Sequence, residues 1–81
     1  MLELTKAEYK QDYKIWIELN NGRSGIVDLS DLLWGEMFEP LKDLNNFRKF
    51  NLSEIFATIV WENGADIAPE YLLKNLVYVY F

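Results

Sequence analysis

The feature that most constrains the fold is a strand-like segment that runs directly into an Asn-Gly pair. Apolar residues alternate with polar ones or tryptophan at Tyr13, Ile15, Ile17 and Leu19. This period of two is typical of a strand with one buried face. Asn21-Gly22 follows, and Asn-Gly favours a two-residue hairpin turn, in which both central residues need a positive φ. The pattern predicts a hairpin with strands over 12–20 and 23–28, in which Ile17 faces Ile26.

Strand and helix signals alternate along the rest of the chain. Pro69 is placed for the first turn of a helix, since a proline there removes no needed hydrogen bond. The expected elements are a strand over 3–9, short helices over 28–35 and 40–46, a second hairpin from 47–52 and 56–61, and a helix over 69–75. We therefore predict an α+β fold: one small domain over 1–81, with an antiparallel sheet built from two β-hairpins and short helices between and after them.

The aromatic residues supply both core candidates and interface candidates. Trp16, Trp34 and Trp61 lie on apolar patterns and are expected in the core or at its edge. An exposed tryptophan would instead mark a docking surface, because Trp and Tyr are enriched where partners bind. The apolar run over 76–81 predicts either a paired final strand or an exposed sheet edge. The candidate interface residues are Tyr78, Tyr80, Phe81 and Trp34.

Composition excludes most kinds of small active site. The 81 residues include no Cys and no His. Disulfides, thiolate nucleophiles, Cys-based zinc sites and imidazole general bases are therefore ruled out. Asp28 and Asp31 flank a predicted helix start, where capping explains them. We expect no enzyme activity, no catalytic residues, no cofactor and no metal site.

The charge balance limits the partners. Thirteen acidic against eight basic residues give a formal charge of −5, and the basic residues are too dispersed to neutralise nucleic-acid phosphates. An acidic surface is most often a solubility feature, but it also suits a basic protein partner. The start of the chain lacks the apolar core of a signal peptide, and the apolar runs are too short to span a bilayer. We expect a cytoplasmic protein that binds neither nucleic acid nor membranes.

The order of landmarks from 13 to 75 resembles a bacterial domain-of-unknown-function family, number twenty-four forty-two. Matching pieces are the strand before Asn21-Gly22 and the stretches over 27–35 and 38–43. The most specific part is a Trp-x-Asn-Gly-Ala-Asp-x-Ala-Pro-Glu signature, formed here by Trp61, Asn63, Gly64, Ala65, Asp66, Ala68, Pro69 and Glu70. Two positions depart from the family pattern: Phe56-Ala57 replaces a glycine turn, and Glu62 replaces a frequent proline.

This resemblance implies a small α+β domain without established catalytic residues. Some members are fused to a helix-turn-helix domain, and others are encoded beside small toxin-like proteins, which implies an antitoxin-like role. The signature also has a structural explanation. Asn63-Gly64 permits a tight turn, Asp66 can bond nearby backbone N–H groups, and Pro69 starts a helix.

Three functional hypotheses follow. The first is a non-enzymatic interaction module, the neutralising partner of a basic toxin-like protein. The second is a small-ligand-binding or carboxylate-based catalytic domain, which would need a pocket with converging carboxylates. The third is a homo-oligomer that associates through the 76–81 edge.

Overall fold

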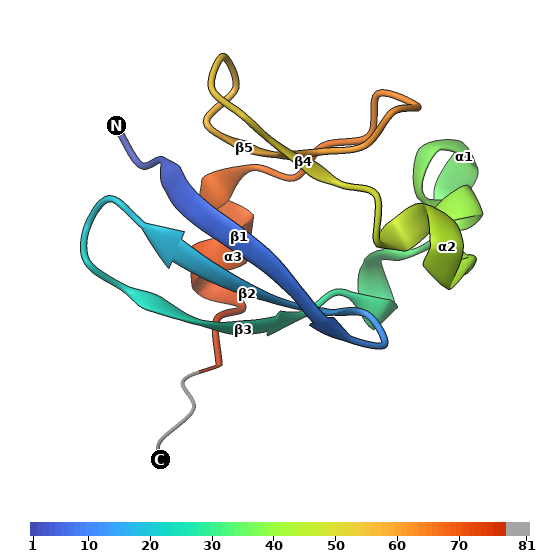
Figure 1. The fold of residues 1–81 in the computed structure, drawn as a ribbon, viewed down its shortest axis with the longest axis horizontal. Coiled ribbons are helices and arrows are strands. Elements are labelled where there is room, and N and C mark those ends of the chain that lie inside the picture. The colour runs from blue at the N-terminus through green and yellow to red at the C-terminus, as the bar shows by residue number, and fades with distance from the viewer. Residues whose placement is uncertain (78–81) are drawn as a thin grey trace.

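Two antiparallel sheets form the framework of the computed structural model, which describes residues 1–77 (Figure 1). The larger sheet has the order β1-β2-β3, and the smaller one pairs β4 with β5. The strands are β1 (Leu4–Gln11), β2 (Lys14–Leu19), β3 (Ser24–Asp28), β4 (Asn51–Ser53) and β5 (Thr58–Val60). The predicted α+β class is confirmed, with the strands divided between two sheets.

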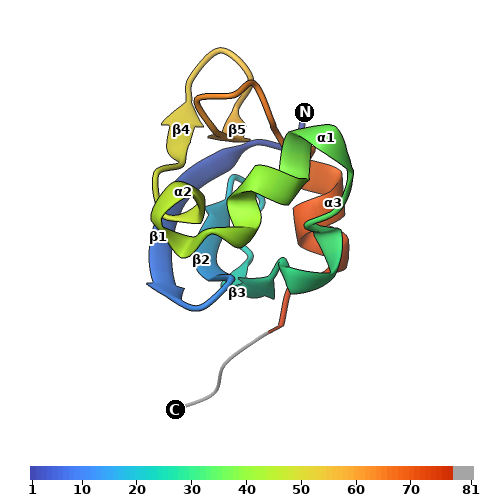
Figure 2. The same cartoon turned by 90° about the vertical axis from the view of Figure 1, so that its right-hand side faces the viewer.

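Short helical elements connect the two sheets and follow the second one. They are the 3₁₀ turns η1 (Ser30–Leu32) and η2 (Glu39–Lys42) and the helices α1 (Gly35–Phe38), α2 (Leu44–Phe47) and α3 (Pro69–Lys74). Pro69 occupies the first turn of α3, as predicted. Figure 2 shows α3 on one side of the three-stranded sheet, with α1 and α2 in front.

The first hairpin forms with a register one residue away from the prediction. Ile17 faces Gly25, and Trp16 faces Ile26. The loop is longer than two residues, because the Leu19 N–H donates to the Arg23 carbonyl at 2.8 Å. Gly22 has a φ of 87°, whereas Asn21 does not adopt a positive φ. A three-residue loop with glycine in the left-handed position therefore replaces the expected two-residue turn.

The helix expected over 40–46 is interrupted at Asp43. This residue has an extended ψ of 114°, and its side chain accepts a hydrogen bond from the Asn45 N–H at 2.9 Å. Asp43 thus caps a new helix, α2, instead of continuing η2. As a result Leu41 is buried while Leu44 is 38% exposed, so these two leucines do not share one buried helix face.

The helix expected over 28–35 is reduced to the single turn η1, and Gly35 begins α1 with a φ of 84°. The Asp28 Oδ1 accepts the Ser30 N–H at 3.0 Å, but the N-cap residue of η1 is Leu29, which makes no side-chain cap bond, so the expected helix cap is replaced by a local turn. The strand expected over 47–52 is also shorter, because Phe47 ends α2 and pairing begins at Asn51.

The core lies between the larger sheet, α3 and the smaller hairpin. Strand β2 buries every second residue, as its alternation predicted. An aromatic cluster extends this core, with the Phe47 ring 5.2 Å from Tyr13 and 5.9 Å from Trp61. The buried apolar residues are Leu4, Ile15, Ile17, Leu19, Val27, Leu29, Leu33, Leu41, Phe47, Ile59, Trp61, Ala65, Ile67 and Leu72.

The β4–β5 hairpin contacts β1 through its turn. The Leu4 N–H donates to the Ala57 carbonyl at 2.9 Å. Ala57 itself has a φ of 56°, a left-handed conformation that is unfavourable for a residue with a side chain. This is the position where the family resemblance led us to expect glycine. The tip of the hairpin leaves Ile55 89% exposed.

The chain after α3 returns to the outer edge of β3. Val77 and Ile26 exchange two backbone hydrogen bonds, each 2.8 Å long. Gly25 makes this approach possible, because a Cβ there would lie 2.6 Å from the Val77 carbonyl oxygen. Val77 is thus paired with the edge of β3, and the predicted final strand beyond it is not described. Tyr78, Tyr80 and Phe81 lie outside the described residues.

We predict that Gly25→Ala lowers the free energy of unfolding by about 1–3 kcal/mol, because the added methyl group overlaps the Val77 backbone. Ser24→Ala, its neighbour in β3, should change stability by less than about 0.5 kcal/mol. Urea denaturation of the two variants measures both values. Equal stability of Gly25→Ala and the unsubstituted protein would contradict the close approach of Val77.

A second prediction concerns Asp28. The Ser30 backbone N–H and then the Ser30 hydroxyl hold the pKa of this carboxyl below its ordinary value of 3.8. A lowered pKa in the folded state means that the ionised carboxylate stabilises the fold above pH 3.8. This contribution is lost as the pH falls through the lower folded value.

An NMR titration of the Asp28 carboxyl carbon in folded and urea-unfolded protein tests the sign. We expect the lower pKa in the folded protein. Ser30→Ala should keep part of the difference, since the backbone N–H remains. A folded-state pKa at or above the unfolded one would refute the hydrogen bonds from Ser30 to Asp28.

Candidate functional site

The first half of the signature is a tight turn anchored in the core. The Trp61 indole N–H donates to the Phe47 carbonyl at 2.9 Å, which satisfies the polar group of a buried tryptophan. The Trp61 backbone N–H donates to the Ala65 carbonyl at 2.9 Å, and the Gly64 N–H donates to the Trp61 carbonyl at 3.0 Å. Gly64 has a φ of 92°. The predicted Asn-Gly turn is present.

Asn63 connects this turn to α1. Its Oδ1 accepts the Ala65 N–H at 3.0 Å, and its Nδ2 donates to the Met37 carbonyl at 2.8 Å. The bond to Met37 joins residues that are 26 positions apart. The turn was predictable from the sequence, but this tertiary contact was not, because it depends on where α1 lies.

The second half of the signature combines structural residues with exposed carboxylates. The Thr58 hydroxyl is buried and donates to the Ile67 carbonyl at 2.5 Å. The Asp66 backbone forms a bridge with Val60. Within residues 1–77, however, no hydrogen bond joins the Asp66 carboxylate to the nearby N–H groups that it was expected to bind. The side chains of Asp66 and Glu70 are exposed.

Exposed apolar side chains lie in α1 and just before it, and α1 contacts the Asn63 turn through Met37. Trp34 is 72% exposed and immediately precedes α1, and Met37 within α1 is 44% exposed. The expectation of Trp34 as a core residue is therefore wrong, because its segment turns outward after Leu33. Trp61 is buried and Trp16 is half-buried, as predicted. Trp34 thus has the exposure that a candidate interface residue needs.

Acidic residues are concentrated in the two segments that the Asn63–Met37 bond connects. Segments 31–39 and 62–70 hold six acidic residues and no basic residue, a formal charge of −6. The remainder holds seven acidic and eight basic residues, so it carries +1 and the total is −5. All six acidic side chains are exposed: Asp31, Glu36, Glu39, Glu62, Asp66 and Glu70.

We call the exposed side chains of these two segments the acidic face. Figure 2 shows α1 and the loop after β5, which carry its central part, on the side nearest the viewer. Counting basic residues along the chain would have revealed the asymmetry, since none occurs over 24–41 or 50–73.

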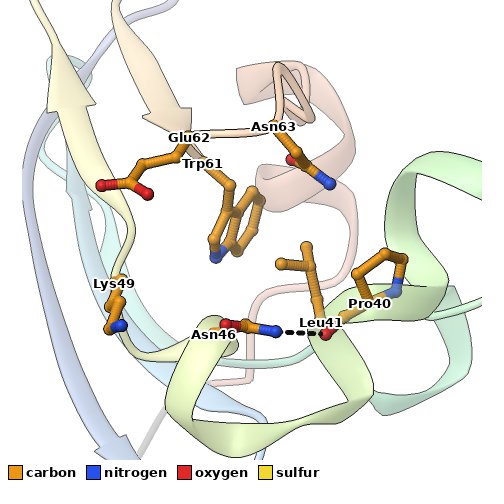
Figure 3. Close-up of a pocket in the computed structure, with 7 residues that line it drawn as sticks. All are labelled: Pro40, Leu41, Asn46, Lys49, Trp61, Glu62 and Asn63. Carbon is orange, nitrogen blue, oxygen red and sulfur yellow. Dashed lines mark hydrogen bonds between the residues drawn. The ribbon is translucent and has the colours of Figure 1, made fainter.

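A small pocket adjoins the acidic face (Figure 3). Its volume is about 190 Å³. Leu41 and Trp61, which are both buried, form its inner wall. On one side of the pocket, the Asn46 Nδ2 donates to the Pro40 carbonyl at 3.1 Å. The lining residues are Pro40, Leu41, Asn46, Lys49, Trp61, Glu62 and Asn63. No sequence motif indicated this pocket.

Other kinds of site were sought over the same part of the chain. In residues 1–77, no group of three or more acidic side chains is arranged to hold a metal ion. None of the described helices has the length and apolar character needed to cross a membrane.

The family comparison agrees with the resemblance seen in the sequence. A family model described as "Protein of unknown function (DUF2442)" matches residues 4–78. The chain belongs to the DUF2442 family. The match begins at the first residue of β1, so the family domain includes this strand as well as the region from 13 onward. Neither the comparison with curated proteins nor that with solved structures gave a match.

We predict that Asn63→Ala lowers the free energy of unfolding by about 1–2 kcal/mol, because it removes two hydrogen bonds and leaves the Met37 carbonyl unpaired. Asn45→Ala, at an exposed position of α2, is the matched control. It should leave the stability unchanged or raise it slightly, since alanine favours helices.

Hydrogen exchange should also show faster opening of α1 in Asn63→Ala than in Asn45→Ala. Identical stability and exchange in the two variants would mean that Asn63 does not hold α1 against the turn.

Proposed function

We propose that this protein is a non-enzymatic interaction module that binds a basic protein partner through its acidic face. The observation that carries the proposal is that the two connected segments combine two features. They have a formal charge of −6 without any basic residue, and they include the exposed Trp34. Exposed acidic residues alone would suit solubility. A largely exposed tryptophan among them has no such benefit and favours contact with a partner.

The two kinds of side chain have different roles in this proposal. The carboxylates accelerate the encounter with a positively charged surface and select against acidic partners. Trp34 and Met37 provide the contact area that holds the complex, because truncating a central aromatic residue in an interface typically costs about 2 kcal/mol or more. Met37 adds an adaptable apolar surface.

The form of action proposed is antitoxin-like: the partner is a small basic protein whose active surface is covered on binding. Charge complementarity supports this form, as does the resemblance to relatives encoded beside toxin-like proteins. The rest of the chain, with a formal charge of +1, has no comparable attraction for a basic surface.

The small-ligand alternative has less support. Ligand pockets usually occupy about 300–1,000 Å³, whereas the pocket beside the acidic face measures about 190 Å³ and contains a single carboxylate, that of Glu62. Converging carboxylates, which the catalytic alternative requires, are not found in it.

The test is co-purification of the tagged full chain from its native host, with captured proteins identified by mass spectrometry. We expect a basic partner whose binding weakens as salt increases. Trp34→Ala should weaken binding at least about tenfold, a change that corresponds to the loss of one central aromatic contact.

Ile55→Ala is the matched control, since Ile55 is an exposed apolar residue at the tip of the β4–β5 hairpin, away from the acidic face. It should bind as tightly as the unsubstituted chain. Recovery of a free monomer at every salt concentration, or equal binding by both variants, would refute the proposed function.

A further inference from the structure

We propose that the pocket bordered by η2, α2 and the loop after β5 receives an arginine side chain of the basic partner. This inference rests on the proposed function, because it names the group by which the partner would be anchored next to the acidic face. It adds a binding site formed by residues that the interface candidates did not include.

The size of the pocket favours one side chain over a larger ligand. A volume of about 190 Å³ lies below the range of about 300–1,000 Å³ that drug-sized ligands and cofactors occupy. Leu41, Trp61 and Pro40 give it apolar walls (Figure 3). Arginine carries a methylene stem that packs on such walls while its charged end stays at the rim.

The hydrogen-bonding groups of the pocket favour a bound group that donates hydrogen bonds. The Nδ2 of Asn46 already donates to the Pro40 carbonyl, and the Nδ2 of Asn63 donates to the Met37 carbonyl. Over residues 1–77, neither the Asn46 Oδ1 nor the Glu62 carboxylate accepts a hydrogen bond. One N–H of each amide is used, and the Asn46 Oδ1 and the Glu62 carboxylate remain as acceptors, which suits a guanidinium, a group with five N–H donors and no acceptor.

Lys49 is the opposing charge at the rim. It forms no ion pair with Glu62 within the described residues, so its ammonium is not neutralised there. An anionic ligand would use Lys49, while an arginine would use Glu62 and be weakened by Lys49. The two residues therefore distinguish a cation site from an anion site.

The experiment is an NMR titration of the full chain with Nα-acetyl-arginine methylamide as the probe. We expect shifts of the Asn46 side-chain amide and of the Trp61 indole N–H. The citrulline analogue, which has the same shape without the charge, should cause much smaller shifts at equal concentration.

Charge-removing variants show whether the pocket binds a positive or a negative group. Glu62→Gln should weaken binding of the probe about threefold, and Lys49→Gln should strengthen it by a similar factor, as expected for partly exposed charge pairs. Glu54→Gln, on the β4–β5 turn, is the control and should not change the affinity. The NMR spectra also report whether each variant is folded.

Several results would overturn the inference. Lys49→Gln weakening and Glu62→Gln strengthening the binding would show an anion site, and tighter binding of the lysine analogue would refute the choice of arginine. Absence of shifts at the pocket, while a basic partner still binds through Trp34, would refute the arginine site and leave the proposed function standing. Shifts at the pocket without any basic partner would refute the proposed function alone.

Discussion

The contact between Phe47 and Trp61 is the interaction on which the other parts depend. The Phe47 carbonyl accepts the Trp61 indole N–H, and the Phe47 ring packs against Trp61 and Tyr13. Phe47, the last residue of α2, thus holds Trp61, at the end of β5, against Tyr13 in the turn between β1 and β2. The signature turn and the part of the pocket wall formed by Trp61 derive their positions from this contact, since Trp61 begins that turn. A chain without cysteines gains its rigidity here from aromatic packing.

Local signals predicted the elements, and competing local interactions decided their details. Alternation identified β2 and its partner correctly, but Asn21-Gly22 is compatible with two loop lengths. The longer loop places Gly25 opposite Ile17, where Val77 can approach. Likewise, Asp43 could continue a helix or cap the next one, and its side-chain bond to Asn45 favours the cap. Periodicity does not encode these choices, because each depends on the contacts made by the finished fold.

Of the candidate site, only the turn at Asn63-Gly64 was predictable from the sequence. The signature indicated a tight turn at Asn63-Gly64, because those residue types have a direct conformational preference. The outward position of Trp34, the bond from Asn63 to Met37 and the pocket all depend on the position of α1, a four-residue helix with little sequence signal of its own. The concentration of negative charge was readable from the sequence by counting, but its meaning required knowing that the two segments touch.

The uneven distribution of charge gives the molecule an electric dipole, with its negative end at α1 and the loop after β5. Near a polyanion such as nucleic acid, this dipole favours orientations in which the negative end turns away. The acidic face would then stay open in a crowded, anionic surrounding, while a cationic surface would reverse the preferred orientation. The protein could in this way be presented to its partner in the correct orientation before any atoms touch.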